Sequence, residues 1–359
     1  MTKRVEISAS QLVTLLFLSR AFTLLTYSTK TDQISQNAGI LFALALSAVL
    51  YVVALIPTFL LVRRRRDYSI IEWSFAVKPW FGKGVAALYF AFLVLVTANT
   101  ISHFEFFLTS SIYPNASPTL FVVLFLLAVA YAVYMGLEAC ARMSGFVFWG
   151  VVAGTAFLFL CLFQKADPIF LRSPFSIDLK TTVATGFSGV GASLEITTIL
   201  LLIPMVRGNL TKASGALSAM IMVYYQLISV FAITSLGEYA QSHLFPIYSM
   251  AAVAEFSVMQ RLDSLFMAMW VFIAFVRTAL FFYLAVHMLG YLAPKPVASR
   301  GIGIVGALVL LLSLVLANNY QAMRLIRSFF ASGIAVVLFL LVVPGIVLCT
   351  AARKKEVSQ

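Results

Sequence analysis

The sequence predicts an all-α, polytopic integral membrane protein, and two features lead to that prediction. Of its 359 residues, 62% are hydrophobic and only 11% are charged, whereas soluble globular domains are about 45–50% apolar and about 25% charged. The apolar residues also form continuous runs of roughly 20, the length that an α-helix needs to cross a bilayer. The alternating strands of a membrane β-barrel would not produce such runs.

Ten apolar runs of this kind divide the chain, which we expect to form one membrane domain over residues 1–359. The expected spans are 8–28, 38–61, 84–110, 118–137, 142–164, 181–206, 212–236, 263–290, 300–317 and 326–350. Four of them, and one of the segments between them, carry residues that a plain membrane helix or loop would not need.

The first span is polar for a membrane helix, with hydroxyl side chains along its length and Arg20, next to Ser19, near its centre. An ionisable residue at mid-membrane costs about 2.5–3.5 kcal/mol on insertion scales. We therefore expect Arg20 to lie in a polar cavity or to pair with an acid. An ion pair that only holds helices together is the alternative.

The segment 63–83, after the second span, mixes bases with Trp73, Trp80 and Phe81. Aromatic rings of amphipathic segments lie at headgroup depth, and bases attract anionic lipid. We expect this segment to lie along the inner leaflet, either as a topology anchor or as a site for particular lipids.

His103 and Glu105 fall in the outer half of the third span. Ionisable groups inside a membrane often form proton or ion relays, so these two residues are candidates for such a relay. Because they lie near the outer surface, an internal pair or a side chain that reaches the surface is the alternative.

The sixth span contains Gly186, Gly189 and Gly191, followed by Glu195, where a plain span would carry Leu and Ile. Glycine weakens a helix, and the backbone groups that it frees are tolerated in lipid only where they face protein or a watery cavity. The glycines lack the four-residue spacing of a simple packing motif. We predict a broken helix that lines a site, with a small-residue packing face as the alternative.

Arg277 lies near the centre of the eighth span and gives, with Arg20 and Glu195, two bases and one acid at similar depth. If the three meet in space, the surplus positive charge suits a ligand carboxylate. The predicted ligand-binding residues are Ser19, Arg20, Gly186, Gly189, Gly191, Glu195 and Arg277. Three scattered cysteines and three histidines show no metal-ligand spacing, so we expect no metal and no cofactor.

Lysines and arginines predict the orientation of the chain, because cytoplasmic loops carry an excess of them. With a cytoplasmic N-terminus, sixteen fall on the inner side and seven on the outer side, which places both termini in the cytoplasm. The seven outer bases are Lys30, Lys165, Arg172, Lys180, Arg261, Arg324 and Arg327. Since the bases punctuate apolar runs instead of forming a dense basic face, the net charge of +12 does not indicate nucleic-acid binding.

The first and sixth spans, both irregular, open the two halves of a ten-span chain. Because five is odd, the second half begins on the opposite face of the membrane, so a repeat of five plus five spans must be inverted. Many secondary transporters have this layout, with the first helix of each half interrupted at the midplane. We therefore predict an inverted repeat with interrupted first and sixth helices.

Three local patterns resemble a known family. Ser69-Ile70-Ile71-Glu72-Trp73 with Phe81-Gly82-Lys83 resembles a Ser-x-x-Glu-aromatic…Gly-Lys loop. Gly191…Glu195 with Pro204 resembles a small-residue stretch that leads to Glu, and Gln260-Arg261-Leu262-Asp263 with Trp270 resembles an Arg-x-acidic…Trp signature. Their order and spacing, with the length and the ten spans, are similar to the permease-like B subunit of spore-germinant receptors, in the amino acid–polyamine–organocation superfamily.

This resemblance implies a LeuT-like bundle in the inner membrane of a spore, which senses a small nutrient, typically an amino acid. It also implies two partners, an A subunit and a lipoprotein C subunit. The superfamily often has a Gly-x-Gly break in the first span, whereas residues 18–22 here contain no glycine. We therefore expect Arg20 itself to supply positive charge for the ligand.

Three functions compete at this point. In a germinant sensor, the ligand shifts a conformational equilibrium by its different affinity for the two states. In a proton- or sodium-coupled amino-acid transporter, Glu195 or Glu105 would carry the proton. The fifth span offers no mid-span Lys or Asp as a coupling group, which favours sensing. A membrane enzyme is the least supported, because the sequence shows no clustered catalytic residues.

Overall fold

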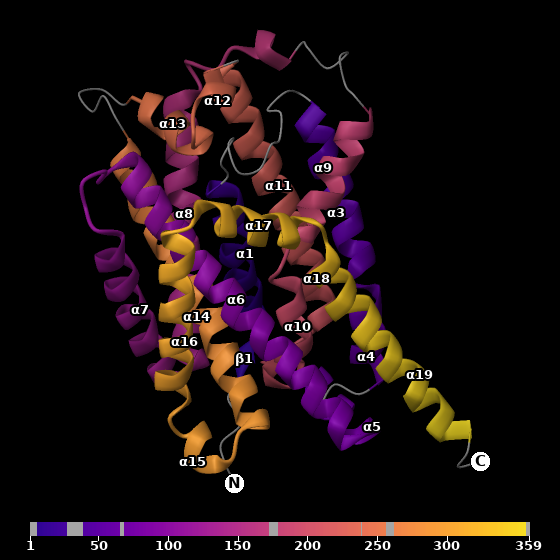
Figure 1. The fold of residues 1–359 in the computed structure, drawn as a ribbon. Coiled ribbons are helices and arrows are strands. Elements are labelled where there is room, and N and C mark those ends of the chain that lie inside the picture. The colour runs from indigo at the N-terminus through magenta and orange to yellow at the C-terminus, as the bar shows by residue number, and fades with distance from the viewer. Residues whose placement is uncertain are drawn as a thin grey trace.

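The computed structural model describes residues 6–26, 39–64, 68–171, 179–237, 239–255 and 262–356, and helices form most of them (Figure 1). The first half contains α1 (Ala9–Leu25), α3 (Gly39–Ala54), α4 (Ile56–Arg64), α5 (Ile70–Val77), α6 (Pro79–Ser111), α7 (Pro118–Met135) and α8 (Leu137–Leu162). The second half contains α9 (Leu179–Gly191), α10 (Ile196–Leu202), α11 (Leu210–Leu236), α12 (Tyr239–Ser242), α13 (Pro246–Val253), α14 (Asp263–Leu292), α15 (Lys295–Ala298), α16 (Gly301–Ala317), α17 (Tyr320–Ala331), α18 (Ile334–Val337) and α19 (Val343–Glu356).

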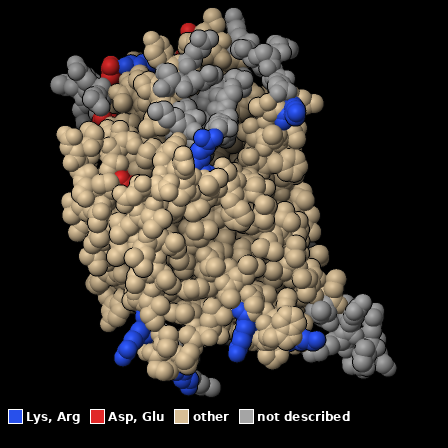
Figure 2. Space-filling view, in the orientation of Figure 1, with Lys and Arg blue, Asp and Glu red and all other residues tan. Residues whose placement is uncertain are grey.

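Among the residues that the structure describes, seven helical segments are long and apolar enough to cross a membrane, and the number is eight if α16 and α17 count as one span. Two shorter apolar helices, Ala9–Leu25 and Ile334–Cys349, overlap the first and last expected spans. Charged side chains gather at the two ends of the molecule, with a broad, largely uncharged surface between them (Figure 2). The prediction of an all-α, multi-pass membrane protein is confirmed, and the number of ten crossings stays a prediction.

The apolar helix that overlaps the last expected span, 326–350, begins at Ile334 and not at residue 326. A separate helix, α17, precedes it and is bent by 110° from α16, so that it crosses the molecule between α16 and α18 (Figure 1). Gly333, at φ 77°, then turns the chain into the next helix, a conformation that favours glycine. Hydropathy merges α17 with the following span because bulky apolar residues alternate there with Arg324 and Arg327.

The predicted interruption of the first span is absent from the described residues, since α1 is one continuous helix from Ala9 to Leu25. Neither glycine nor proline occurs in this segment, and a helix without them has no intrinsic break point. Ser8 begins the helix with a capping box that also uses Gln11. The polar residues of the first span therefore serve contacts with other helices instead of a local break.

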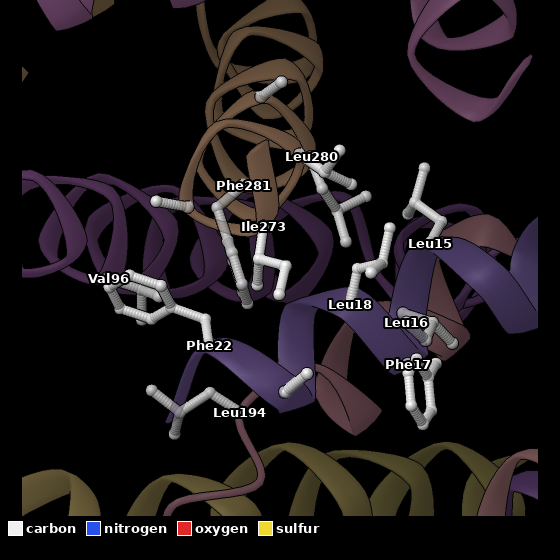
Figure 3. Packing of buried hydrophobic residues seen from close by; sticks show 14 of the residues in the cluster. Leu15, Leu16, Phe17, Leu18, Phe22, Val96, Leu194, Ile273, Leu280 and Phe281 are labelled. Carbon is white, nitrogen blue, oxygen red and sulfur yellow. The ribbon is translucent and has the colours of Figure 1, made fainter. Parts of the chain in front are cut away.

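The core of the molecule surrounds α1. This helix packs against α8, α11 and α14, and α14 packs in turn against α6, α7 and α8. Figure 3 shows Leu18 and Phe22 of α1 on the side of Ile273, Leu280 and Phe281 of α14, whereas Phe17 points the other way, toward Phe148 and Tyr224. Trp270, fully buried on α14, donates a hydrogen bond from Nε1 to Thr26 Oγ1 over 3.0 Å. The helix that carries Arg20 is thus held on several sides.

The family-like loop after the second span has a structural role. Ser69 and Glu72 form the capping box of α5, with each side chain bonded to the other residue's backbone. A Cβ atom at Gly82 would lie 2.4 Å from Cγ of Phe75, so glycine lets α6 pass close to α5. Arg261, from the third pattern, lies outside the described residues.

The start of α1 is fastened to the end of the sixth span. Strand β1 (Ile7–Ser8) pairs in parallel with β2 (Val206–Arg207), and Arg207 forms an ion pair with Glu6. These contacts join the two segments that carry Arg20 and Glu195 at one end of the molecule.

Candidate functional site

The sixth span is broken as predicted. Helix α9 ends at Gly191, α10 begins at Ile196, and residues 192–195 between them form turns. The backbone N–H of Ser193 donates to the carbonyl of Val190 over 2.9 Å, which tightens the end of α9. Glu195 stands directly at the start of α10. The interruption therefore brings the carboxylate of Glu195 to the face of α1.

Arg20 and Glu195 meet at this interruption, buried inside the molecule. Arg20 Nε lies 4.0 Å from Glu195 Oε1, and the two side chains are only 5% and 0% exposed. Arg20 Nη2 donates a hydrogen bond of 2.8 Å to the carbonyl of Gly189, on the last turn of α9. The sequence-based expectation that Arg20 pairs with an acid agrees with this geometry.

Tyr225 of α11 fixes Arg20 from a third side. Its ring lies under the guanidinium, 4.9 Å from the ring centroid to Cζ, and its hydroxyl donates a 2.9 Å hydrogen bond to the backbone carbonyl of Arg20. A cation over an aromatic face is attracted by the electrons of the ring. Three elements, α9, α10 and α11, thus determine where the guanidinium lies.

The buried pair keeps unused hydrogen-bonding capacity. Within the described part of the chain, no hydrogen-bond partner reaches Nε or Nη1 of Arg20, or either carboxylate oxygen of Glu195. Most buried polar atoms in proteins have such a partner, and an unmet one is costly in a low-dielectric interior. These four atoms therefore keep unused hydrogen-bonding capacity inside the molecule.

A cavity of about 390 Å³ lies next to Arg20, within the size range of small-molecule sites. It is bounded by α1, α3, the end of α9, α11, α13 and α17. Its polar lining residues are Arg20, Thr23, Thr185, Ser188, Tyr225, Ser229, Arg324, Arg327, Ser328 and Ser332. Arg20 lies on the α1 side of the cavity, and α17 contributes Arg324 and Arg327 on another side.

Arg277 is near this site but is held by other partners. Its guanidinium donates to Thr100 Oγ1 on α6 over 3.3 Å, to Thr23 Oγ1 on α1 over 3.2 Å, and to the backbone carbonyl of Ser19. It also lines a smaller cavity of about 80 Å³, together with His103 and Arg327. The geometry makes Arg277 and Ser19 a bonded link between α14 and α1.

The glycines of the sixth span make close helix contacts. A Cβ atom at Gly186 would lie 2.8 Å from Leu46 Cδ2, and one at Gly189 would lie 2.2 Å from Ser47 Oγ, both on α3. A Cβ atom at Gly191 would lie 2.4 Å from the carbonyl oxygen of Ala331. Of the three, only Gly189 is among the described residues that line the larger cavity. Both of the alternatives raised by the sequence, a break and a packing face, therefore hold in this helix.

His103 and Glu105 point to different surroundings. Residues two apart in a helix lie on opposite faces. His103 contacts Arg327 of α17 through Nε2 and lines the smaller cavity, whereas Glu105 accepts a 3.0 Å hydrogen bond from Thr109 on its own helix. The structure therefore places His103, but not Glu105, against Arg327, a residue that lines the same cavity as Arg20.

Sequence reasoning missed three residues of this site. Arg324 and Arg327 were assigned to an outer loop, and Tyr225 carried no signal in a long apolar span. The spacing of Arg324 and Arg327, three residues apart, places them on one face of a helix. That pattern was the available sign that α17 presents two charges to one surface.

Comparison with known protein families gives a match over residues 6–322 to the spore permease family, described as spore germination protein. The chain belongs to this family. A search of the curated proteins finds no match. The spore permease match covers α1, the interruption and α14, whereas Arg324 and Arg327 lie beyond its last residue. Together with the apolar helices, membership shows a multi-pass membrane protein of the spore germination permease family.

Proposed function

We propose that this spore permease is the nutrient-binding membrane subunit of a germinant receptor, and that the nutrient's carboxylate binds at Arg20. This proposal rests mainly on the buried guanidinium of Arg20, whose Nε and Nη1 atoms have no hydrogen-bond partner among the described residues. The guanidinium lies beside a cavity of about 390 Å³ and a broken helix. Arg binds carboxylates through paired N–H donors. An amino acid is one nutrient that provides this group.

In this proposal, a ligand that binds Arg20 changes the contacts between α1 and the two halves of the broken helix. In the described structure, Arg20 Nη2 holds the carbonyl of Gly189 and Nε faces Glu195. A ligand carboxylate competes for the same guanidinium, so it changes how α1 is joined to α9 and α10. The ligand shifts the equilibrium toward whichever arrangement binds it more tightly. In our proposal, this shift is passed to the A subunit and the lipoprotein C subunit.

The packing of helices supports the proposed inverted repeat of five plus five spans. If each span corresponds to the one five positions later, contacts in one half should have counterparts in the other. The contact of α1 with α11 corresponds to that of α9 with α3, and the contact of α7 with α14 corresponds to that of α16 with α6. Both members of each pair occur. We propose ten crossings on this basis, with α1 and the last apolar helix as the two short ones.

The proposal includes a location. With both termini in the cytoplasm, α5 and α15 would lie at the inner surface, and α12, α13 and the 110° bend before α17 toward the outside. Excess Lys and Arg near the inner ends support this orientation. For a germinant receptor, the membrane is the inner membrane of the spore, and the cavity beside α13 and α17 then lies toward the incoming nutrient.

The direct test is a nutrient dose–response of spores that carry Arg20→Ala or Glu195→Gln. We expect both variants to lose the response, and Glu195→Gln to do so while the protein stays at its normal level in the membrane. Arg300→Gln is the matched control, because Arg300 is exposed and precedes α16, whose 17 residues put about 25 Å between it and α17. A normal dose–response in both site variants would remove Arg20 and Glu195 from the function.

A second candidate function is coupled transport, and one observation favours it. The carboxylate of Glu195 is fully buried without a hydrogen-bond partner among the described residues, and carboxylates inside membrane spans often serve in proton relays. Uptake of labelled nutrient into proteoliposomes distinguishes the two functions. Gradient-driven accumulation that is lost in Glu195→Gln would establish transport, and binding without accumulation would establish sensing.

A further inference from the structure

The smaller cavity, beside Arg277, is lined by two residues whose buried polar atoms bond to nothing in the described part of the chain. The atoms are the amide oxygen Oδ1 of Asn99 and the ring nitrogen Nδ1 of His103, both on α6. Residues four apart lie on the same face of a helix, so the two side chains reach this cavity together. His103 is only 5% exposed. Because an unbonded polar atom in such a place is costly, an occupant that bonds both atoms would be stabilised there.

The contact with Arg327 determines which kind of partner His103 needs. Nη1 of Arg327 lies against Nε2 of the imidazole, and the nitrogens of a guanidinium can only donate hydrogen bonds. Nε2 therefore accepts, and the proton of the neutral ring is on Nδ1. His103 thus offers an N–H donor, whereas Asn99 offers a carbonyl acceptor. A group that satisfies both must accept one hydrogen bond and donate another.

The other polar side chains of this lining already have partners. Thr100 Oγ1 donates to a carbonyl of its own helix and accepts from Arg277. Thr26 Oγ1 donates to a carbonyl of α1 and accepts from Trp270. The rest of the wall is largely apolar, with two phenylalanines, a leucine and two alanines among the described residues. The unmet polar atoms on α6 therefore decide which side chain this cavity prefers.

The two cavities adjoin each other. Four described residues line both of them, namely Thr23, Ala192, Arg327 and Ala331. Thr23 follows Arg20 by three residues and lies on the same face of α1. A molecule whose carboxylate binds Arg20 can therefore extend a side chain past Thr23 into the smaller cavity. At about 80 Å³, this cavity has room for about five groups of the size of a water molecule, enough for a short side chain.

We infer that the smaller cavity is the specificity subsite of the nutrient site, and that it selects a neutral side chain ending in a primary amide or a hydroxyl. This inference rests on the proposed binding function and names the ligand's chemical class. The ligand's amide carbonyl accepts from Nδ1–H of His103, and its N–H group donates to Oδ1 of Asn99. A hydroxyl does both through one oxygen. An apolar side chain of the same shape leaves both protein atoms unbonded, and sites built to bond a polar group reject analogues that lack it.

The experiment measures affinities from saturable ligand-induced shifts in Tm of the purified full chain in lipid nanodiscs. The probes are three pairs of amino acids with side chains of similar shape: asparagine and leucine, glutamine and methionine, threonine and valine. We expect the polar member of at least one pair to bind about tenfold more tightly than its apolar partner, or better. The pair with the largest ratio shows whether an amide or a hydroxyl is preferred. Apolar members that bind as tightly as the polar members in all three pairs would overturn the inference and leave the smaller cavity to water.

Variants of α6 test the two contacts. Asn99→Leu keeps the approximate shape of the side chain and should abolish the preference for the polar member. His103→Phe removes the Nδ1–H donor and should reduce the same preference. Asn115→Leu, the same change as the first at an exposed residue in the turn after α6, is the matched control and should leave the preference unchanged. If His103→Phe loses its contact with Arg327 and folds poorly, Asn99→Leu still tests the subsite, because Oδ1 of Asn99 has no hydrogen bond to lose.

The outcomes separate this inference from the proposed function. If polar and apolar members bind equally, and the double variant Arg20→Ala with Glu195→Gln abolishes binding, the subsite is wrong and the proposed function stands. A preference that survives both Asn99→Leu and His103→Phe refutes the subsite in the same way. If none of the six amino acids shifts Tm, this inference fails, and the dose–response of spores decides the proposed function separately. If binding survives the double variant, both proposals fail.

Discussion

The Nε atom of Arg20 lies 4.0 Å from Oε1 of Glu195, a distance at which the charges attract but no hydrogen bond forms. Both side chains are buried, on helices that meet at the break in the sixth span. A buried pair with this gap is a poor structural link, because it loses the solvation of two charges without full bonding in return. We regard it as a site that a ligand completes.

The first prediction concerns the coupling of this pair. Arg20→Ala should destabilise the protein by about 3–5 kcal/mol, since it leaves a buried carboxylate without its counter-charge. Adding Glu195→Gln to that variant should recover part of the lost stability. Thermal unfolding of the two single variants and the double variant measures the coupling energy. Strictly additive changes in stability would show that the two charges do not interact.

The second prediction concerns the close approach of the broken helix to α17. Gly191→Ala should destabilise the protein by about 1–3 kcal/mol, because the new Cβ would lie 2.4 Å from the carbonyl oxygen of Ala331 and 2.6 Å from the N atom of Gly333. Gly215→Ala on α11 is the matched control, since nothing lies within 4 Å of its Cβ position. Equal Tm values for the two variants would contradict the packing described here.

A third prediction separates Arg277 from the ligand contacts. Arg277→Lys should lower Tm, because an ammonium cannot keep the hydrogen bonds to Thr100, Thr23 and Ser19 in the same geometry. The expected cost is about 1–3 kcal/mol. Ligand titrations should give the same ranking of candidate nutrients as the wild-type chain. A reversed ranking would mean that Arg277 itself contacts the ligand.

The fourth prediction treats the family-like Ser-x-x-Glu pattern as a helix cap. Ser69→Ala should cost about 0.5–2 kcal/mol of stability, because the N–H of Glu72 loses the acceptor that Ser69 Oγ provides. Ser110→Ala, an exposed change near the end of α6, should have a smaller effect on Tm. Ligand affinity should not change in either variant, and a loss of affinity in Ser69→Ala with unchanged Tm would argue for a direct functional role.

The sequence predicted the features of the site that depend on local chemistry. Three glycines and a glutamate in one span predicted the break between α9 and α10, and the cost of a buried charge predicted that Arg20 would lie in a polar cavity or pair with an acid. The prediction of a break in α1 was wrong, because it took the polar residues of the first span as signs of an interrupted helix. In the structure, polar side chains of α1 form hydrogen bonds across helices, as Thr23 Oγ1 does when it accepts from Arg277.

The features that depend on the path of the chain could not be predicted in the same way. The apolar residues of α17 join those of the next helix in any hydropathy profile, so the 110° bend was not recognised and Arg324 and Arg327 appeared as loop charges. Tyr225 reaches Arg20 only because α11 packs on α1. Such long-range neighbours are set by packing and have no local signal.

The sign of the charge in the cavity can be measured without a known ligand, by chemical modification of a cysteine introduced as Ser188→Cys. The background chain has Cys140, Cys161 and Cys349 replaced by alanine, so that only the introduced thiol reacts. Ser188 lines the cavity on α9. Rates of modification by anionic and cationic methanethiosulfonates are each normalised to the rate with a free small thiol. We predict faster modification by the anionic reagent, a preference that Arg20→Ala reduces. A preference for the cationic reagent, unaffected by this change, would contradict an anion site beside Arg20.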